Sequence, residues 1–359
     1  MKYKILTIIG TRPEIIKMFP VIQKLDQFFD NLLVWSGQHY DFRMAKKIFL
    51  DVNLRKPDYY IKLSKKKIPF FEIQEKIYKI IRKVKPKAIV YHGDTFTALA
   101  SALISRFFFK NIINIHVEGG YRSFDKTQTE EQIRFIADHI SKINFVARNI
   151  EKNNLFKENN KKDIFVVGNS INDSVKLIQD KNNFNADLLK RHKLEDEKFV
   201  YCTIHRSENV ENHIRLKKIL NLINDISKKN KVIFTVHPRT KKKLQMMKNI
   251  FNPRVILTKP LSYSESIYLL SKCLFCFSDS GGLQEEAVIL KKRCLIPSNY
   301  TPHNYYLDKN ANCILRLDDK NYKSKVKEFI NNIKDIKIKK FKHKKNISSF
   351  IVRILKKKI

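Results

Sequence analysis

Apolar runs of strand length alternate with amphipathic helical patterns along almost the whole chain. In the helical stretches, such as Thr97–Phe109 and Ile214–Lys228, apolar residues recur every three or four positions. Strands that alternate with helices form parallel sheets with helices on both faces. We therefore predict an α/β protein with two successive series of strands. The first series is Lys4–Ile9, Leu32–Ser36, Ala88–His92, Ile112–Val117, Asn144–Ala147 and Ile164–Val167, and the second is Phe199–Ile204, Lys231–His237, Val255–Leu257, Leu274–Ser278, Arg293–Ile296 and Cys313–Leu317.

The two series indicate two Rossmann-like, doubly wound domains. The break falls near Val167–Ser170, and a helical pattern and the charged, Asn-rich stretch Gln179–Asn185 follow it. We expect an N-terminal domain over residues 1–168 and a C-terminal domain over residues 169–335. Ligands bind beyond the carboxyl ends of the strands in open parallel sheets, so we expect the two domains to face a common cleft.

The charge balance is strongly basic. The 359 residues include 72 Lys and Arg against 35 Asp and Glu, which gives a formal net charge of +37. Such a charge raises the hypothesis of a nucleic-acid partner. The lysines are spread over the whole chain, however, with no basic arm and no stripe of interleaved aromatic residues. We attribute the excess to A/T-rich codons and expect no nucleic-acid partner.

The composition also bears on the compartment. Hydrophobic residues make up 43% of the chain, and no apolar run reaches the roughly 18 residues that a membrane span needs. Met1–Gly10 resembles a first strand more than a signal peptide, since its apolar part is short. Cys273 and Cys276 lie in an apolar run, where we expect buried cysteines rather than a redox or zinc pair. We therefore expect a protein of the reducing cytoplasm that does not enter the membrane.

Glycine is scarce, and most of the glycines follow predicted strands. There are only 8 in the chain, and Gly10, Gly93 and Gly119 each close a strand. After Gly10, Thr11 can cap a helix, and Arg12 and Lys17 add cations beside its free amide groups. This pattern fits a phosphate-binding loop, although a capped helix with solvated charges is the alternative.

A second loop of the same type lies in the C-terminal half. Ser280, Gly281 and Gly282 precede a helix, and the glycines allow a pyrophosphate to approach the backbone amides. Glu286, one turn into the helix, can accept hydrogen bonds from sugar hydroxyls, whereas we expect Glu285 to face solvent. Ordinary capping of the helix by Asp279 or Ser280 is the alternative.

Carboxylates occupy two neighbouring strand ends of the first half. Asp94 follows one strand and Glu118 ends the next, and paired acids suit general acid–base chemistry. A helix cap for Asp94 and a salt bridge for Glu118 are the alternatives. Glu130 and Arg134 are neighbours at i,i+4 on one helix face, and Thr129 with Gln132 fits a capping box at the start of that helix.

Two histidines end strands of the second half, each with a nearby arginine. They lie in His205–Arg206 and His237–Arg239, which suits a cleft that holds phosphate groups. No histidine has a carboxylate partner at metal-ligand spacing, so no metal site is predicted.

Together these segments resemble the UDP-N-acetylglucosamine (UDP-GlcNAc) 2-epimerase family. The resemblance extends to about residue 300. The matching pieces occur in the family's order and are Gly10–Glu14, His92–Thr95, His116–Glu118, Glu130–Arg134, Val167–Asn169, His205–Arg206, His237–Pro238 and Asp279–Glu286.

The resemblance implies two Rossmann-like halves in the glycosyltransferase-B arrangement, with a C-terminal helix in residues 336–359 that returns to the first half. It implies interconversion of UDP-GlcNAc and UDP-ManNAc without a nicotinamide cofactor or a metal. In the family mechanism the C2 proton is removed, UDP leaves to give 2-acetamidoglucal, and UDP adds again with the opposite C2 configuration. A homodimer is a further expectation at the family level.

The resemblance also implies roles for individual residues. Asp94, Glu118 and Glu130 resemble the acid–base set, with Arg134 orienting Glu130, and His205 resembles a diphosphate contact that assists UDP departure. The nucleotide site is expected to contain Arg12, Lys17, Ser280, Gly281, Gly282 and Glu286, and a regulatory site to contain Gln38, His39, Arg206 and His237.

Three departures from the family pattern leave alternatives open. Thr301–Tyr305 lacks an arginine expected near the nucleotide, Gly119 stands where the non-hydrolysing branch usually has Ala, and Thr129 replaces a proline. The Glu-Gly-Gly sequence at residues 118–120 is typical of the hydrolysing branch, which releases ManNAc and UDP. We therefore keep three alternatives to the non-hydrolysing epimerase: the hydrolysing enzyme, an epimerase of a related UDP-sugar, and a glycosyltransferase of similar architecture.

Overall fold

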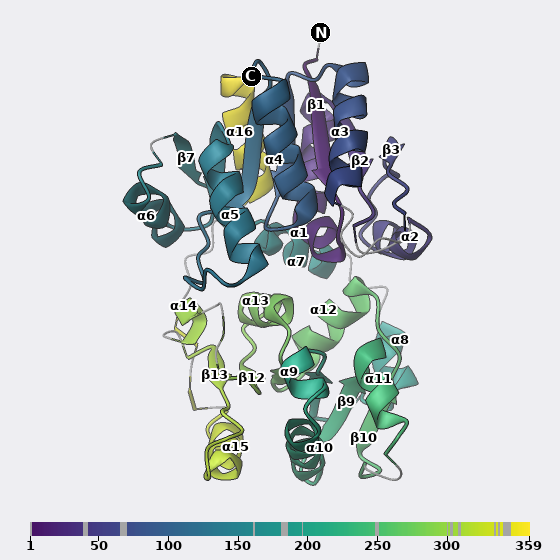
Figure 1. The fold of residues 1–359 in the computed structure, drawn as a ribbon. Coiled ribbons are helices and arrows are strands. Elements are labelled where there is room, and N and C mark those ends of the chain that lie inside the picture. The colour runs from purple at the N-terminus through teal and green to yellow at the C-terminus, as the bar shows by residue number, and fades with distance from the viewer. Residues whose placement is uncertain are drawn as a thin grey trace. The chain divides into compact units, whose positions relative to one another are not determined.

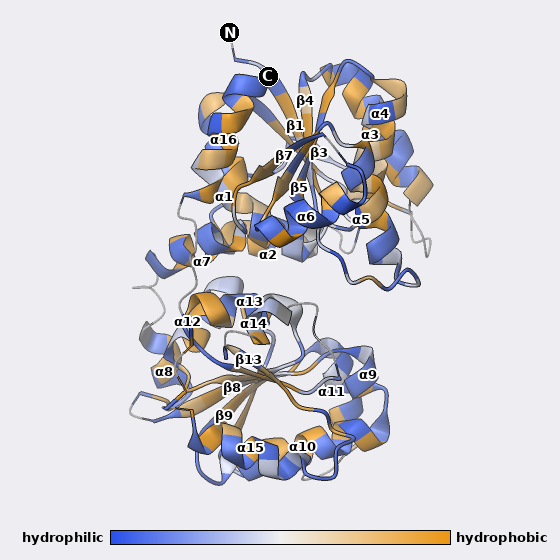
Figure 2. Ribbon diagram, turned by 90° about the vertical axis from the view of Figure 1, so that its left-hand side faces the viewer, coloured by the Kyte–Doolittle hydropathy of each residue, from blue (hydrophilic) through white to orange (hydrophobic). Residues whose placement is uncertain are grey.

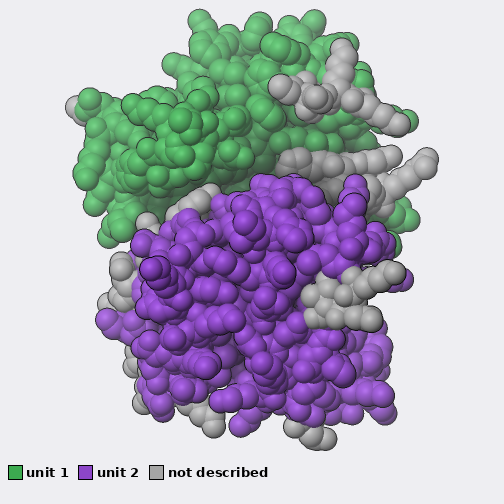
Figure 3. Space-filling model, turned by 60° about the horizontal axis from the view of Figure 1, so that its bottom comes forward, with its two compact units in different colours: residues 1–174, 343–359 green, residues 175–342 purple. Residues whose placement is uncertain are grey.

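The chain folds into two compact units, which Figure 3 distinguishes by colour. Unit 1 comprises Met1–Ser174 with His343–Ile359, and unit 2 comprises Val175–Lys342. The computed structural model describes residues 2–38, 42–64, 70–160, 162–180, 186–195, 197–247, 251–299, 301, 304–307, 310–333, 335–336, 338–339 and 346–359.

Unit 1 contains one parallel sheet, and its strands lie in the order β3-β2-β1-β4-β5-β6-β7. This is the doubly wound order, which reverses between β1 and β4. The strands, labelled in Figure 1, are β1 (Lys4–Ile9), β2 (Asp30–Trp35), β3 (Tyr59–Tyr60), β4 (Ala88–His92), β5 (Ile113–Gly119), β6 (Ile143–Val146) and β7 (Asp163–Val166).

Helices cover both faces of this sheet. Figure 2 shows α1 and α16 on one face and α3, α4 and α5 on the other, with hydrophobic colour toward the strands. Ile77, Ile81 and Ile104 are among the buried residues that pack against the strands. The helices are α1 (Arg12–Phe28), α2 (Phe42–Asp51), α3 (Phe70–Val84), α4 (Phe96–Phe108), α5 (Thr129–Ile140), α6 (Asn149–Lys157), α7 (Ile171–Asp180), which crosses the unit boundary, and α16 (Ile347–Lys358).

The last helix of the chain belongs to unit 1. α16 packs against α1 and buries Ile351 and Leu355. Its first turn is tied to α7 because Asp173 accepts hydrogen bonds from the backbone nitrogen and the hydroxyl of Ser348, at 2.8 and 2.6 Å. The expected boundary after residue 168 lies six residues before the division that the structure shows at Ser174.

Unit 2 repeats the strand order of the first six strands of unit 1 and, within its described residues, has no counterpart of β7. Its parallel sheet has the order β10-β9-β8-β11-β12-β13, and Figure 2 shows α12 and α13 on one face and α10 and α15 on the other. The strands are β8 (Phe199–Thr203), β9 (Lys231–Thr235), β10 (Val255–Thr258), β11 (Cys276–Ser278), β12 (Cys294–Ile296) and β13 (Asn312–Ile314). The helices are α8 (Ala186–Arg191), α9 (Ser207–Val210), α10 (His213–Ser227), α11 (Pro238–Leu244), α12 (Tyr263–Lys272), α13 (Gly281–Ile289), α14 (Asn304–Leu307) and α15 (Tyr322–Asn331).

The predicted α/β class with two doubly wound sheets is confirmed. The edge strand β3 was not predicted, because its two residues are too few to form an apolar pattern. Cys273 and Cys276 are buried and unpaired, as expected, although Cys273 caps α12 rather than lying in a strand. No helix in the described part of the chain combines the length and apolarity that a membrane span requires.

Candidate functional site

The loop between β1 and α1 is built as the sequence predicts. Thr11 caps α1, and its hydroxyl accepts a hydrogen bond from the backbone nitrogen of Glu14 at 3.4 Å. The carboxylate of Glu14 accepts from the backbone nitrogen of Gly10 at 2.8 Å and from the hydroxyl of Thr95 at 3.0 Å. Burial raises the pKa of Glu14, and the nearby charge of His92 opposes this shift only in part. Glu14 thus ties the loop that carries Arg12 to the loop that follows β4.

Glu118, at the end of β5, is paired with a cation. The Nζ of Lys17 donates to both of its carboxylate oxygens, at 2.8 and 2.6 Å, and the Nε2 of His92 lies 3.2 Å away. Burial would raise the pKa of Glu118, but Lys17 and His92 outweigh it and hold the pKa well below its usual range. The structure therefore places Lys17, which the resemblance assigned to the nucleotide, against the expected catalytic carboxylate.

Asp94, in the loop after β4, is also paired with a cation. The guanidinium of Arg134 donates to its carboxylate, and a second nitrogen of Arg134 lies 3.7 Å from Glu131. The expected partner of Arg134, Glu130, is exposed at the start of α5. The structure therefore pairs Arg134 with Asp94 and Glu131 instead of Glu130.

Glu131 is the acid of this helix that the sequence did not single out. It is 6% exposed and accepts hydrogen bonds from the backbone nitrogens of Ser123 and Phe124, at 2.8 and 3.1 Å. It thereby fastens the loop after β5 to the first turn of α5. The predicted capping box is wrong, since the helix starts one residue earlier and its N-cap, Gln128, makes no capping side-chain bond. The i,i+3 spacing of Glu131 and Arg134 was the available clue.

The two glycines after Glu118 are required by their surroundings. Gly120 has φ +77°, and an added Cβ there would lie 2.4 Å from the carbonyl oxygen of Glu151. A Cβ at Gly119 would lie 2.7 Å from Oδ1 of Asp138. Because real Cβ atoms are not found so close to another atom, Gly119 has a local steric explanation in this chain.

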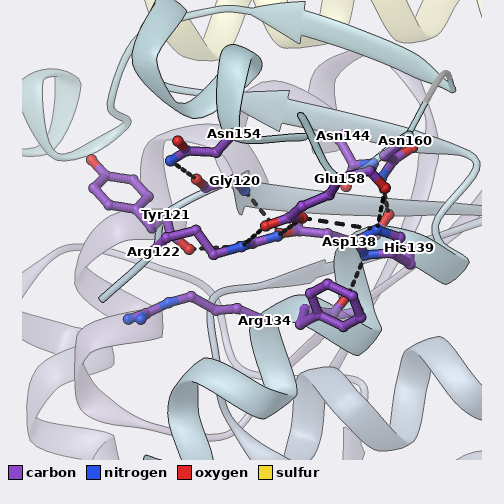
Figure 4. Close-up of polar contacts among 12 residues, drawn as sticks. Gly120, Tyr121, Arg122, Arg134, Asp138, His139, Asn144, Asn154, Glu158 and Asn160 are labelled. Carbon is purple, nitrogen blue, oxygen red and sulfur yellow. Dashed lines mark hydrogen bonds and ion pairs between the residues drawn. The ribbon is translucent and has the colours of Figure 1, made fainter. Parts of the chain in front are cut away.

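A buried polar network lies behind these glycines (Figure 4). Asp138 accepts hydrogen bonds from the backbone nitrogen of Gly120 at 3.0 Å and from Arg122 at 2.8 Å, and its other oxygen lies 2.7 Å from Nδ1 of His116. Arg122 also donates two hydrogen bonds to Glu158, at 2.6 and 2.7 Å. The network fixes the backbone immediately after Glu118, which itself has φ +73°.

In unit 2, a buried carboxylate organises the loop after β8. Asp279 is 0% exposed and accepts hydrogen bonds from the backbone nitrogens of His205 and Arg206 at 3.0 Å each, and from the Nδ2 of Asn209 at 3.0 Å. Burial would raise its pKa, but these donors together with the ring of His205 hold the pKa below its ordinary value. The sequence analysis treated Asp279 only as a possible helix cap. Its position directly after a buried central strand was the clue that it organises the loop after β8.

The expected diphosphate contact, His205, lies at the surface of this loop. Its side chain is 33% exposed, and its ring lies 5.2 Å from the ring of His237 between centroids. Arg239 donates to the carbonyl oxygen of His205 at 2.9 Å. The two predicted strand-end histidines and one of the adjoining arginines are thus brought together.

The glycine loop of unit 2 opens α13. Ser280 caps this helix by accepting from the backbone nitrogen of Leu283 at 3.5 Å, and Gly281 and Gly282 form its first turn. A Cβ added at Gly282 would have no neighbour within 4 Å. Glu286 is buried as a residue one turn into the helix, but the expectation that Glu285 faces solvent is wrong, because it is only 1% exposed.

The segment that departs from the family pattern is tied to the same helix. Thr301 is buried and donates to the carboxamide oxygen of Gln284 on α13, at 2.7 Å. Residues 302–303, which include His303, lie outside the described residues.

The four residues expected in a regulatory site are divided between the two units. Gln38 belongs to unit 1, where its side-chain oxygen accepts from the backbone nitrogen and hydroxyl of Thr97, at 2.9 and 3.0 Å. His39 lies outside the described residues, and Arg206 and His237 belong to unit 2. Within the described residues, no group of three or more His, Cys, Asp or Glu side chains is arranged to hold a metal.

Known proteins are similar to this chain in both sequence and fold. The profile of the family described as UDP-N-acetylglucosamine 2-epimerase matches residues 23–355. The chain is 37% identical to the UDP-N-acetylglucosamine 2-epimerase of Methanococcus maripaludis over 343 residues, which are 91% of this chain and 92% of that protein. It is 31% identical, over 83% of its length, to 84% of the UDP-2,3-diacetamido-2,3-dideoxy-D-glucuronate 2-epimerase of Pseudomonas aeruginosa.

A solved structure extends the likeness to three dimensions. The crystal structure of the Methanocaldococcus jannaschii UDP-GlcNAc 2-epimerase in complex with UDP-GlcNAc and UDP matches with a TM-score of 0.85 and 35% identity, over 99% of both chains. The match confirms the expected glycosyltransferase-B type of fold. With the profile match over most of its length, this chain belongs to the UDP-N-acetylglucosamine 2-epimerase family, whose members are isomerases.

Proposed function

We propose that this protein is a non-hydrolysing UDP-GlcNAc 2-epimerase that interconverts UDP-GlcNAc and UDP-ManNAc. The observation that carries the proposal is the pair of carboxylates at neighbouring strand ends, Glu118 with Lys17 and Asp94 with Arg134. Removal and return of the C2 proton need groups of this type on the sugar. No nicotinamide cofactor and no metal enters this scheme.

We assign the carboxylates to the sugar and the helix N-termini to the nucleotide. Asp94, Glu118 and the exposed Glu130 are the proposed acid–base set, in which Arg134 orients Asp94. Since a low pKa makes Glu118 a weak base, we assign it to stabilising the positive charge that develops on the sugar. Proton removal from C2 then falls to Asp94 or Glu130.

The proposed nucleotide site centres on the start of α13. Gly281 and Gly282 present free amides to the diphosphate, and Glu286 accepts hydrogen bonds from the ribose hydroxyls. Ser280 lies beside these glycines, but its own backbone nitrogen donates to the hydroxyl of Ser278 at 3.0 Å. Arg12 supplies a positive charge, and His205 a ring N–H, that stabilise UDP as it leaves. The open space around Gly282 supports a close approach of the ligand.

A single incubation with UDP-GlcNAc alone tests this proposal. Followed by proton and phosphorus NMR in D₂O, the reaction should give UDP-ManNAc at equilibrium, with deuterium at C2. Free ManNAc and UDP would instead identify the hydrolysing enzyme. No reaction without an acceptor would favour a glycosyltransferase, and it would contradict the proposal.

A second candidate is an epimerase of a related UDP-sugar. The 31% identity to an enzyme named for UDP-2,3-diacetamido-2,3-dideoxy-D-glucuronate favours it, because the same family accommodates another substituted sugar. Parallel assays with the two nucleotide sugars distinguish the candidates by kcat/KM. We also carry forward the expectation of a homodimer, which light scattering on the purified protein tests.

A further inference from the structure

The buried network behind Glu118 contains a histidine whose two ring nitrogens both face acceptors. His116, on β5, is 0% exposed. Its Nε2 lies 2.8 Å from the carbonyl oxygen of Gly93, and its Nδ1 lies 2.7 Å from Oδ1 of Asp138. A carbonyl oxygen can only accept, so Nε2 must carry a proton.

The proton on Nδ1 follows from the state of Asp138. The other oxygen of this carboxylate accepts from the backbone nitrogen of Gly120 and from Arg122, two donors that stabilise the ionised form. An ionised carboxylate offers no proton to share, so Nδ1 must donate as well, and a histidine that donates from both nitrogens is an imidazolium.

The charges around this imidazolium are balanced. Asp138, on α5, and Arg122, in the loop after β5, form an ion pair, and Arg122 is held in turn by Glu158, at the end of α6. Together with His116 these three groups sum to zero net charge. From β4 the ring of Tyr91 faces the imidazole, with 5.5 Å between centroids, and its hydroxyl is engaged with Ser141. A balanced, fully hydrogen-bonded group of charges can be buried, whereas a single unpaired one cannot.

We propose that His116 is a buried positioning residue that donates from both ring nitrogens and holds the loops of Asp94 and Glu118 in register. Its Nε2 fixes the carbonyl of Gly93, the residue before Asp94. Through Asp138 it fixes the backbone of Gly120, two residues after Glu118. A neutral imidazole could donate to only one of these two loops. The role assigned to the two loops rests on the proposed function; the protonation state does not.

Nitrogen NMR tests the protonation state directly. In the ¹⁵N-labelled full chain at pH 8, both ring nitrogens of His116 should show the shifts of protonated imidazolium nitrogens. The resonances are assigned by their loss in His116→Gln. One unprotonated ring nitrogen in the wild-type protein at pH 8 would overturn the inference. This readout needs no enzymatic turnover, so it decides the inference even if the proposed epimerase activity is not found.

Steady-state kinetics test the positioning role. His116→Gln should lower kcat for the epimerisation about 10²-fold, as expected for catalytic groups displaced by about 1 Å. Its Kd for UDP should stay within about twofold of wild type, because the proposed nucleotide loop is in unit 2. Tyr91→Phe is the matched control, since it removes a buried polar group beside His116 that touches neither loop, and it should keep its kcat. A folded His116→Gln variant with unchanged kcat would refute the positioning role.

Discussion

The two units have the same order over their first six strands, but the carboxylates at their strand ends differ in exposure and in hydrogen-bond partners. In unit 1, the side chains of Glu118 and Asp94 are 16% and 28% exposed and face the cations of Lys17 and Arg134. In unit 2, Asp279 is 0% exposed and is occupied by backbone and side-chain donors. The carboxylates of unit 1 are partly accessible to a ligand. In Asp279, by contrast, the carboxylate oxygens accept hydrogen bonds from the protein itself.

The difference shows how the same position in one fold can have two different roles. A carboxylate whose oxygens are taken by backbone nitrogens fixes the shape of a loop and is not available for proton transfer. A carboxylate that is paired with a side-chain cation can exchange that partner for a substrate. Under the proposed function, the same topology therefore supplies reactive groups in unit 1 and a shaped binding loop in unit 2.

The largest expected effect comes from neutralising the carboxylates of unit 1. Asp94→Asn and Glu118→Gln should each lower epimerase turnover about 10³-fold, because acid–base and electrostatic groups contribute on this scale. Their Kd for UDP, measured by calorimetry, should stay close to that of wild type. Full activity in both variants would refute the assignment of unit 1 to chemistry.

Replacing the carboxylate of unit 2 should instead affect folding. In Asp279→Asn, an amide nitrogen replaces one acceptor oxygen among the donors from His205, Arg206 and Asn209. We expect the free energy of unfolding to fall by about 3 kcal/mol, measured by urea denaturation. Asp225→Asn is the matched control, since Asp225 is a half-exposed surface residue paired with Lys228, and it should change stability by less than about 0.5 kcal/mol. Equal effects of the two substitutions would contradict the comparison.

Two glycine substitutions sharpen the comparison further. Gly119→Ala should destabilise the protein by about 2 kcal/mol, because the new methyl group would force Asp138 to move. Gly282→Ala adds a methyl group in open space within a helix, so it should stabilise the protein by about 0.5–1 kcal/mol. If the backbone at Gly282 meets a diphosphate, the same variant should nevertheless bind UDP more weakly. Unchanged UDP affinity would argue against the assignment of this loop.

The last expected effect is a dependence of stability on pH. The pKa of Glu118 is lowered in the folded protein, so its pairing stabilises the fold above the unfolded-state pKa of about 4.3, and this contribution is lost as the pH falls toward the folded pKa. Lys17→Met removes the main partner. The stability advantage of wild type over this variant should be constant from pH 7 to about 5 and then shrink by about 1 kcal/mol toward pH 3. Urea denaturation across this range measures it, and an advantage independent of pH would exclude the pair as its source.

The sequence alone was enough to predict the fold class and the loops that matter. Every predicted strand is present, because apolar runs between helical patterns have few other ways to be buried. The caps at Thr11 and Ser280 were also predictable, since a capping bond joins residues three positions apart. The placement of Asp94, Glu118 and the glycine loop of α13 at strand ends follows from the rule for parallel sheets.

Only the tertiary structure decided which charges meet. Lys17 reaches Glu118 across 101 positions of the chain and Arg134 reaches Asp94 across 40, distances over which sequence spacing carries no geometric information. The sequence analysis paired Arg134 with Glu130 because the spacing of residues within one helix is the only contact geometry that a sequence provides. It placed Glu285 in solvent for a similar reason, since burial depends on what other elements bring to that face.

The sequence by itself therefore determined the succession of strands and helices along the chain, the helix caps and the family. All of these depend on local pattern or on similarity to known proteins. The partners of Lys17, Arg134 and Asp279, the steric need for Gly119 and the two protons of His116 depend on atoms brought together by packing. Hydrogen bonds and steric contacts act only over a few ångströms, so they are settled only when the chain has folded.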